Sequence, residues 1–549
     1  MKSWRSSPKL PSAATGLFLL GLAAASGGAG AATVSLPPAD LDAIGLPSPT
    51  DPSGPPPLPP DLWQETSRTT VAQFLQRLPR DLPSATLRSL AKRLMVLEAD
   101  LPAGPPIQSG DAGALLGARL IALTQWGEGA SVDAILARVP ARRLAQEDLT
   151  RAQVLRAFTA GQEADACARH AQRQGVEDGF WLSIRLACLL LREQPKEAAA
   201  LLKQVRDQTA LNPVLTALAD RLGSGKPWAD FPWPQQQPVS IPAAAVLRAH
   251  GLVLPGLENV SGTGGAALAL LAEAPNAPPA QRLAVAEAAA LRGALPLARL
   301  DLLYREVGAG QERAAAHVAL LSATQPAQQV VALADALMTA QRAKLLPLAA
   351  RLYGPLLRAL PVLPGAIPQA SIIARALLLS DTPRAAAPWV TLLRRAAERD
   401  ASAQADLPRL AILARLAFGE QAALVDTPLL QDWVETQPLP DPALVTLVFA
   451  AFDGLEEPLP PFAWDFLATP TNRGGEAFDD AAGWLRLRAA GLAGRVGEVA
   501  ILSLILSEGR TPGPGEALHL GALISALRYA GLEESARALA LESLIQAGL

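Results

Sequence analysis

Two stretches of helical periodicity, separated by a glycine, occupy Gln281–Gly308, and this pattern constrains the fold more than any other feature of the chain. The first apolar stripe, at helical spacing, consists of Leu283, Ala286, Ala290 and Leu291. The second stripe consists of Leu295, Ala298, Leu302 and Leu303. Gly293 lies between them, where the end of a helix favours a left-handed residue. Because the turn is so short, it predicts two adjacent antiparallel helices, a helical hairpin.

Similar segments recur along the chain. Trp484–Gly509 aligns with the hairpin without a gap, and Trp181–Leu202 aligns after a one-residue slip near Pro195. In this alignment the position of closest helix contact holds small residues, namely Cys188, Ala289 and Gly491. A helical hairpin cannot bury its apolar faces alone, so we expect the copies to stack on one another.

The turn of the hairpin carries a further spacing: a glycine, then an alanine five residues later, then an apolar or small residue four residues after that. This spacing occurs at Gly293, Ala298 and Leu302, and again at Gly531, Ala536 and Ala540 within Tyr529–Ile545. It resembles the turn of the tetratricopeptide repeat, although the aromatic positions of the first helix and the closing proline of that repeat are mostly missing. The resemblance implies a degenerate tetratricopeptide-like α-solenoid protein of the bacterial envelope. An irregular helical array is the alternative.

Composition favours helices over a sheet. Half of the 549 residues are hydrophobic but only 4% are aromatic, so alanine and leucine supply most of the apolar surface. No segment shows convincing period-2 alternation of apolar and polar residues, which a half-buried strand requires. We therefore expect an all-α fold of stacked antiparallel helical hairpins without a significant β-sheet. A chain of this length is too long for one core and fits either several domains or one solenoid.

The first 31 residues have the three parts of a secretory signal peptide. Basic residues come first, at Lys2, Arg5 and Lys9, and the apolar stretch Ala13–Ala25 follows. Residues 29–31 then match an A-x-A cleavage site. This pattern predicts export to the periplasm with a mature chain that begins near Ala32; the alternative is a leader retained as an anchor. No later segment reaches the roughly 18–20 apolar residues of a membrane span, so we expect no stable span after cleavage.

Proline clusters divide the remaining chain. Residues 32–62 are rich in proline and are expected to form a disordered linker. An N-terminal helical domain is predicted for residues 63–222 and a C-terminal helical solenoid for residues 243–549, with a loop-rich break at 461–475. The loop at 223–242 contains three aromatic residues, Trp228, Phe231 and Trp233. Such side chains are costly to leave in water, so we expect them either to pack into a groove of the solenoid or to bind a partner.

Cys167 and Cys188 are the only cysteines of the chain. Predicted helices at about 150–173 and 180–192 place each cysteine about ten residues, or roughly 15 Å, from a turn centred near Glu177. Antiparallel helices would hold the two sulfurs at equal depth, and an exported chain enters an oxidising compartment. We therefore predict a structural disulfide. The alternative is a pair of unbonded cysteines that act as small apolar core residues.

The sequence offers no motif for catalysis or for binding a metal or cofactor. The four histidines are scattered, at His170, His250, His317 and His519, and none has a second metal ligand at suitable spacing. Neither a G-x-S-x-G elbow nor an H-E-x-x-H motif is present. A net charge of −3 lacks the basic excess of a nucleic-acid-binding protein. We expect no enzyme activity, no cofactor, no metal and no nucleic-acid partner.

Helical solenoids present long concave surfaces to proteins or peptides. The leading hypothesis is therefore a non-catalytic periplasmic scaffold that mediates protein–protein interaction. One alternative is an accessory or regulator of cell-wall synthesis or hydrolysis enzymes, because similar Ala-rich superhelical domains occur beside lytic transglycosylase domains. Another alternative is an enzyme whose site has no recognisable motif. Neither the partner, nor the binding face, nor the oligomeric state follows from the sequence.

Overall fold

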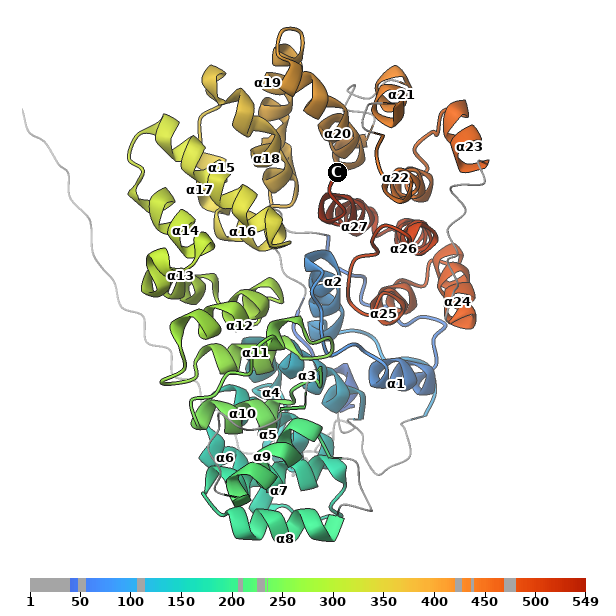
Figure 1. The fold of residues 1–549 in the computed structure, drawn as a ribbon. Helices are drawn as coiled ribbons and strands as arrows, with labels where there is room; N and C mark the ends of the chain where they lie inside the picture. The colour runs from blue at the N-terminus through green and yellow to red at the C-terminus, as the bar shows by residue number, and fades with distance from the viewer. Residues whose placement is uncertain are drawn as a thin grey trace, which may run out of the picture. The chain divides into compact units, whose positions relative to one another are not determined.

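The computed structural model describes residues 40–47, 56–105, 114–205, 211–224, 233–234, 236–419, 427–435, 439–468 and 480–549. Within these segments the secondary structure is α-helix with short 3₁₀ turns, and β-type pairing is limited to two isolated bridges (Figure 1). The predicted all-α class is therefore confirmed. The predicted signal peptide and its cleavage site lie outside the described residues. Across the described segments, no helix is long and apolar enough to cross a membrane.

The helices up to residue 322 are α1 Arg68–Gln76, α2 Ala85–Val96, α3 Ala114–Trp126, α4 Gly129–Leu136, α5 Glu147–Thr159, α6 Glu163–Gln172, α7 Gly179–Leu191, α8 Pro195–Val205, α9 Pro213–Ser224, α10 Ile241–Ala249, α11 Gly265–Ala272, α12 Pro279–Leu291, α13 Leu297–Val307 and α14 Glu312–Ser322. The helices after residue 322 are α15 Pro326–Arg342, α16 Leu346–Leu352, α17 Gly354–Ala359, α18 Ile367–Leu378, α19 Ala387–Ala397, α20 Ala401–Phe418, α21 Thr427–Glu435, α22 Pro442–Gly454, α23 Pro461–Ala468, α24 Ala481–Leu492, α25 Val496–Leu506, α26 Ala517–Tyr529 and α27 Glu533–Gln546. The 3₁₀ turns are η1 Leu41–Ala43, η2 Ala141–Arg143, η4 Leu257–Asn259, η5 Gly308–Gly310, η6 Pro364–Ala366 and η7 Pro383–Ala386.

The three aligned segments each form two contacting helices, namely α7 with α8, α12 with α13 and α24 with α25. Their aligned small residues, Cys188, Ala289 and Gly491, are all buried. At Gly491 the helices approach so closely that a Cβ atom would lie 3.0 Å from the Cα of Ala526 in α26. At Gly491 side-chain size is therefore restricted by α26, and not by the hairpin partner α25.

The apolar stripe of α13 differs from the predicted one. Leu300, Leu303 and Tyr304 are buried, whereas Ala298 is exposed and Leu302 is 54% exposed. Positions 298 and 302 do share one face, because they are four residues apart. That face points to solvent, and the neighbouring helices cover the other one. The prediction that Ala298 and Leu302 line the helix contact is therefore wrong.

Within the compact unit Asp40–Leu549, the first helices of the chain pack against the last ones. α1 contacts α25, and α2 contacts both α25 and α27 (Figure 1). Backbone hydrogen bonds join the same regions: the N–H of Ser84 donates to the carbonyl of Gly509 over 3.2 Å, and the N–H of Gly497 donates to that of Leu62 over 3.0 Å. In an open solenoid each repeat contacts only its neighbours. The hairpin pattern did not predict this closure.

The hydrophobic core of the described residues forms two clusters. One cluster draws its residues from 41–152 and 320–549, and the other draws them from 154–314 together with Leu348. The clusters do not follow the predicted division at 223–242, because the first cluster unites the two ends of the chain. Burial of apolar surface therefore links segments that are remote in sequence.

The prediction of a disordered proline-rich linker is wrong for its described parts, residues 40–47 and 56–62. Three leucines of these parts are buried: Leu41, Leu58 and Leu62. Asp42 of η1 accepts hydrogen bonds from the N–H groups of Leu115 and Leu116, each over 3.0 Å, at the start of α3. A carboxylate at this place satisfies donors that a helix N-terminus leaves unpaired.

Arg119 of α3 fastens this N-terminal segment to the end of α2. Its guanidinium donates to the carbonyls of Met95 and Leu97, each over 2.9 Å, and to those of Asp42 and Ile44, each over 3.1 Å. Burial lowers the pKa of Arg119 to about 10. A buried guanidinium needs such partners, because each unmet donor would carry the cost of lost hydration.

Candidate partner-binding groove

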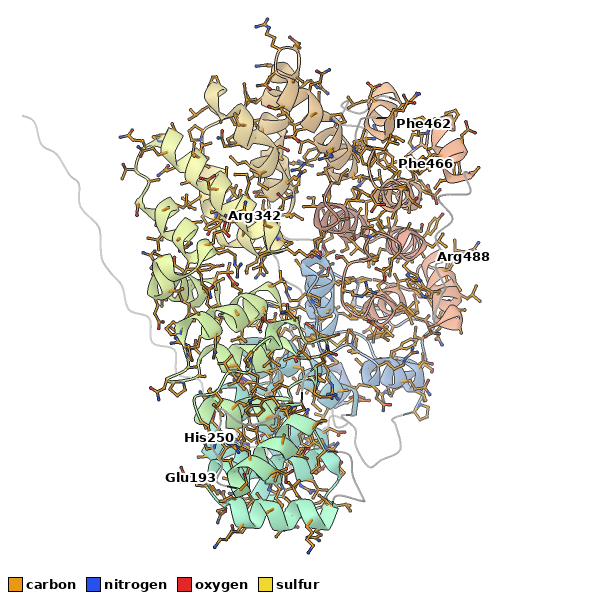
Figure 2. The ribbon with its side chains drawn as sticks, in the orientation of Figure 1. Glu193, His250, Arg342, Phe462, Phe466 and Arg488 are labelled. Carbon is orange, nitrogen blue, oxygen red and sulfur yellow. A yellow bond between two sulfur atoms is a disulfide. The ribbon has the colours of Figure 1, made fainter. Side chains whose placement is uncertain are left out.

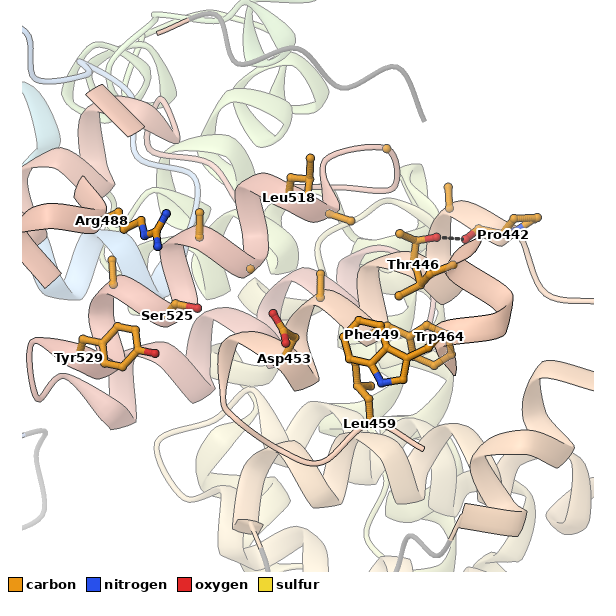
Figure 3. A pocket seen from close by; sticks show the side chains of 18 of the residues that line it. Pro442, Thr446, Phe449, Asp453, Leu459, Trp464, Arg488, Leu518, Ser525 and Tyr529 are labelled. Carbon is orange, nitrogen blue, oxygen red and sulfur yellow. Dashed lines mark hydrogen bonds between the residues drawn. The ribbon is translucent and has the colours of Figure 1, made fainter. Parts of the chain in front are cut away.

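A groove of ≈ 990 Å³ opens over the C-terminal helices and is bordered by α22, α23, α24 and α26 (Figure 3). Its size lies in the range of sites that bind ligands or short chain segments. It is formed mostly by apolar side chains, with few polar groups between them.

The floor of the groove is the seam between α22 and α26, which pack closely because glycines face each other. A Cβ atom at Gly454 would lie 2.9 Å from the Cβ of Ile524, and one at Gly521 would lie 3.3 Å from the carbonyl oxygen of Ala450. Gly454 lets the two helices approach, and Gly521, which lines the groove, leaves the space above it unfilled. The depth of the groove thus follows from residue size along the seam.

The wall formed by α23 is held to α22 through aromatic contacts. Phe449 of α22 is buried, and its ring meets those of Phe462 and Phe466 edge-on, with centroids 6.3 and 5.8 Å apart. Figure 2 labels these two phenylalanines near α22 and labels Arg488 below them, at α24. Edge-to-face pairs of this kind add about 0.5–1.5 kcal/mol beyond burial. The prediction of a loop-rich break at 461–475 is wrong for residues 461–468, which form α23.

Large apolar side chains on the walls and floor remain in contact with solvent. Trp464 is 54% exposed, Leu492 is 63% exposed and Leu518 is 57% exposed. Single exposed leucines are common on protein surfaces. Here three such side chains line one concave surface, an arrangement typical of an interaction site.

Two charges of opposite sign lie in the groove without a side-chain partner among the described residues: Asp453 of α22 and Arg488 of α24. Figure 3 shows Asp453 between an end lined by Phe449 and Trp464 and an end that holds Arg488 and Tyr529. The groove is therefore apolar at one end and polar at the other.

Tyr529 is fixed at the polar end by its neighbours. Its hydroxyl donates to Glu456 over 3.0 Å, and the guanidinium of Arg528 lies 5.2 Å from the centre of its ring. The hydroxyl of Thr446 is also engaged, since it donates to the carbonyl of Pro442 over 2.8 Å. Few polar groups of the lining are thus left to bond an occupant.

The polar side chains of the lining include Asp441, Ser525 and Tyr529 besides Asp453 and Arg488. Asp441 accepts the N–H of Ala443 over 2.9 Å and thereby caps α22. In the described part of the chain, no group of three or more His, Cys, Asp or Glu residues is arranged to hold a metal ion.

The aromatic residues predicted to pack or bind lie elsewhere. Trp228 and Phe231 fall outside the described residues. Trp233 is partly buried against the core cluster of residues 154–314 and takes no part in the groove. For Trp233 the observed burial therefore agrees with the packing alternative and not with a side chain left free to bind a partner.

The structure places Cys167 of α6 and Cys188 of α7 at disulfide distance. Their sulfurs are 1.95 Å apart, their Cα atoms are 5.7 Å apart, and both residues are buried. The predicted helix at 150–173 is in fact two helices, α5 and α6, because Gly161 adopts a left-handed φ of +72° between them. The break leaves the depth of Cys167 relative to the turn near Glu177 unchanged.

Polar side chains from α12, α13, α14 and the junction of α16 with α17 form a cluster around the buried His317. The imidazole of His317 lies 2.8 Å from Asp301 and 3.1 Å from the hydroxyl of Tyr353, and its ring also packs on Tyr304. The hydroxyl of Tyr304 donates to Glu287 over 2.8 Å. Burial lowers the pKa of His317, an effect that the hydrogen bond to Asp301 opposes in part.

This cluster has no room for a substrate. The adjoining cavity, which Tyr304 and Tyr353 line, measures only ≈ 20 Å³, about the space of one water molecule. The hydrogen bonds of His317, Tyr304 and Glu287 are made within the protein. The cluster is therefore a satisfied polar part of the core, of the kind that fixes how helices pack.

Comparison of the chain with protein-family models, with curated proteins and with solved structures finds no match. The resemblance to the tetratricopeptide repeat thus stays an interpretation of the turn spacing.

Proposed function

We propose that this protein is an exported, non-catalytic helical scaffold whose groove binds a segment of a partner protein in the periplasm. The observation that carries the proposal is the concave apolar surface formed by Trp464, Leu492 and Leu518, all more than half exposed. Covering such side chains contributes about 25 cal/mol per Å² of apolar area removed from water. Aromatic anchors of this kind often dominate the energy of an interface.

Two observations support export. The leader has a basic start, an apolar centre and an A-x-A site. The two cysteines of the chain lie at disulfide distance, and disulfides persist in oxidising compartments such as the periplasm. Fractionation with N-terminal sequencing tests this part: a chain beginning near Ala32 is expected in the periplasmic fraction, and a cytoplasmic chain that keeps Met1 would refute it.

Binding is tested by capture from an envelope extract with the full mature protein as bait. Leu518→Glu places a charge on the groove wall, and Leu302→Glu makes the same change at an equally exposed leucine of α13, outside the groove. We expect the wild type and Leu302→Glu to retain the same partner, identified by mass spectrometry, and Leu518→Glu to lose it. Equal retention by all three proteins would reject the groove as the binding surface.

A further inference from the structure

We propose that the occupant of the groove is an amphipathic α-helix of the partner protein, with a basic side chain facing Asp453 and an acidic side chain facing Arg488. This inference rests on the proposed function and specifies the chemistry of the partner.

The polar groups of the lining favour a helix over an extended peptide. An extended segment buried here would need partners for its own N–H and C=O groups. The hydroxyls of Thr446 and Tyr529 already donate within the protein, and Asp441 already caps α22. A helix satisfies its backbone groups internally and presents only side chains to the walls.

The shape of the groove agrees with this occupant. A volume of ≈ 990 Å³ equals that of about two turns of an α-helix with a diameter of about 10 Å. The seam between α22 and α26 is lined by small residues, among them Ala450, Gly521 and Ala522, so the side chains of a third helix can enter as a ridge enters a groove. Trp464 lies at the apolar end, where it can cover the end of the bound helix (Figure 3).

The charges set the pattern that the partner helix must carry. Asp453 lies midway along the groove and Arg488 lies at its polar end (Figure 3). Neither side chain has an ion-pair or hydrogen-bond partner among the described residues, so each would be left unpaired beneath an entirely apolar occupant. A helix with an apolar stripe and one charge of each sign removes that cost.

A lipid acyl chain is the competing occupant, since it too would cover the apolar walls. An anionic lipid head group could pair with Arg488, but such a lipid would leave Asp453 without a cationic partner. The response of binding to charge reversal distinguishes the two occupants.

The probe is a phage-displayed library of randomised helical peptides of about 14 residues, a length at which an isolated helix is only marginally stable without a staple. The library is selected against the full mature protein, and selected peptides are then stapled, labelled and titrated by fluorescence anisotropy. We expect apolar residues to recur at helical spacing, with a basic residue on one side and an acidic residue on the other.

Charge reversal gives the decisive result. Asp453→Lys and Arg488→Glu should each weaken a selected peptide about tenfold, and a peptide with its two charges exchanged should bind the double variant as the original peptide binds the wild type. The matched control reverses two exposed charges elsewhere, Glu398→Lys and Arg358→Glu, and should leave affinity unchanged.

Three results would overturn the inference: no selected peptide or no helical period among those selected, affinity that ignores both reversals, or displacement of the peptide by a fluorescent fatty acid that binds Asp453→Lys no more weakly than the wild type. The last result would identify a lipid-binding groove. A partner captured in a Leu518-dependent manner, combined with any of these results, would keep the proposed function and reject the helical occupant.

Discussion

Ser84 and Glu542 lie 458 residues apart in the sequence, and the hydroxyl of Ser84 donates a hydrogen bond to Oε2 of Glu542 over 2.8 Å. The same buried carboxylate accepts the N–H groups of Ala85 and Thr86 over 2.7 and 3.0 Å. These donors belong to the first turn of α2, where a helix leaves its N–H groups unpaired and favours a negative charge. A residue of the last helix therefore caps the second helix of the chain.

Glu542→Gln tests this cap. The amide keeps one acceptor but turns an NH₂ group toward donors, so we expect the free energy of unfolding to fall by about 2 kcal/mol. Urea unfolding followed by circular dichroism measures the change. Glu398→Gln removes the same charge from an exposed position and should have little effect. The hydroxyl of Ser84 also accepts the N–H of Leu87 over 3.2 Å, so Ser84→Ala should still cost about 1 kcal/mol once Glu542 is changed, but less than it costs in the wild type. Full additivity in this double-variant cycle would mean that the two residues do not act together.

The disulfide is expected to stabilise the fold. A bond between residues separated by 21 positions closes a loop worth about 3 kcal/mol, mainly through the unfolded chain. Reductant should therefore lower the unfolding midpoint of the wild type and leave a Cys167→Ala, Cys188→Ala variant unchanged. Thiol titration of the denatured, unreduced protein should detect no free thiol, and two free thiols would disprove the bond.

Two substitutions in the hairpin of α12 and α13 should differ greatly in their effect on the free energy of unfolding. Gly293 has a φ of +74° and donates its N–H to the carbonyl of Ala290 over 3.0 Å. Proline cannot adopt that φ and has no N–H to donate. Gly293→Pro should therefore lower the free energy of unfolding by about 3 kcal/mol or more. Ala298→Arg changes an exposed position and should alter stability by less than about 0.5 kcal/mol. Thermal unfolding of both variants checks the pair, and a tolerated Gly293→Pro would contradict the turn geometry.

His317 should make the fold sensitive to mild acid. Burial lowers the pKa of its imidazole below the ordinary 6.5. In the unfolded chain this group binds a proton as the pH falls through about 6.5, whereas in the folded protein it stays neutral to a lower pH. The unfolded state therefore holds more protons in that window, and the free energy of unfolding decreases as the pH falls.

The measurement is the pH dependence of urea unfolding between about pH 7 and pH 5 for the wild type and His317→Gln. Burial also lowers the pKa of His170 and of His250, so the variant should retain part of the slope. A slope identical to that of the wild type would exclude a contribution from His317.

The helical class, the hairpin at 281–308 and the pairing of Cys167 with Cys188 could be predicted, because each depends on residues close together in the sequence. Apolar spacing within one helix and the distance of each cysteine from a shared turn are local quantities. The phase of α13 was missed for a related reason. Both faces of that helix carry leucine, so the spacing alone could not tell Leu302 on the exposed face from Leu303 on the buried one.

The groove left only a weak signal. The sequence of α22, PALVTLVFAAFDG, is apolar on most of its circumference, which indicates a helix covered on more than one side. The sequence does not show that α23 and α24 leave part of the surface of α22 uncovered. Trp228, Phe231 and Trp233 stood out because they lie in a proline-rich loop and are costly to leave in water.

By itself the sequence determined an all-α chain with paired helices and two cysteines at matching depth, since periodicity and turn glycines act over a few residues. Only the tertiary structure decided that Ser84 bonds to Glu542, that Arg119 donates hydrogen bonds to carbonyls of two separate segments, and that Asp453 and Arg488 line one groove. The reason is physical. Contacts between remote segments depend on how all the intervening helices pack, and small differences in side-chain size, such as those at Gly454 and Gly521, set the distances between them.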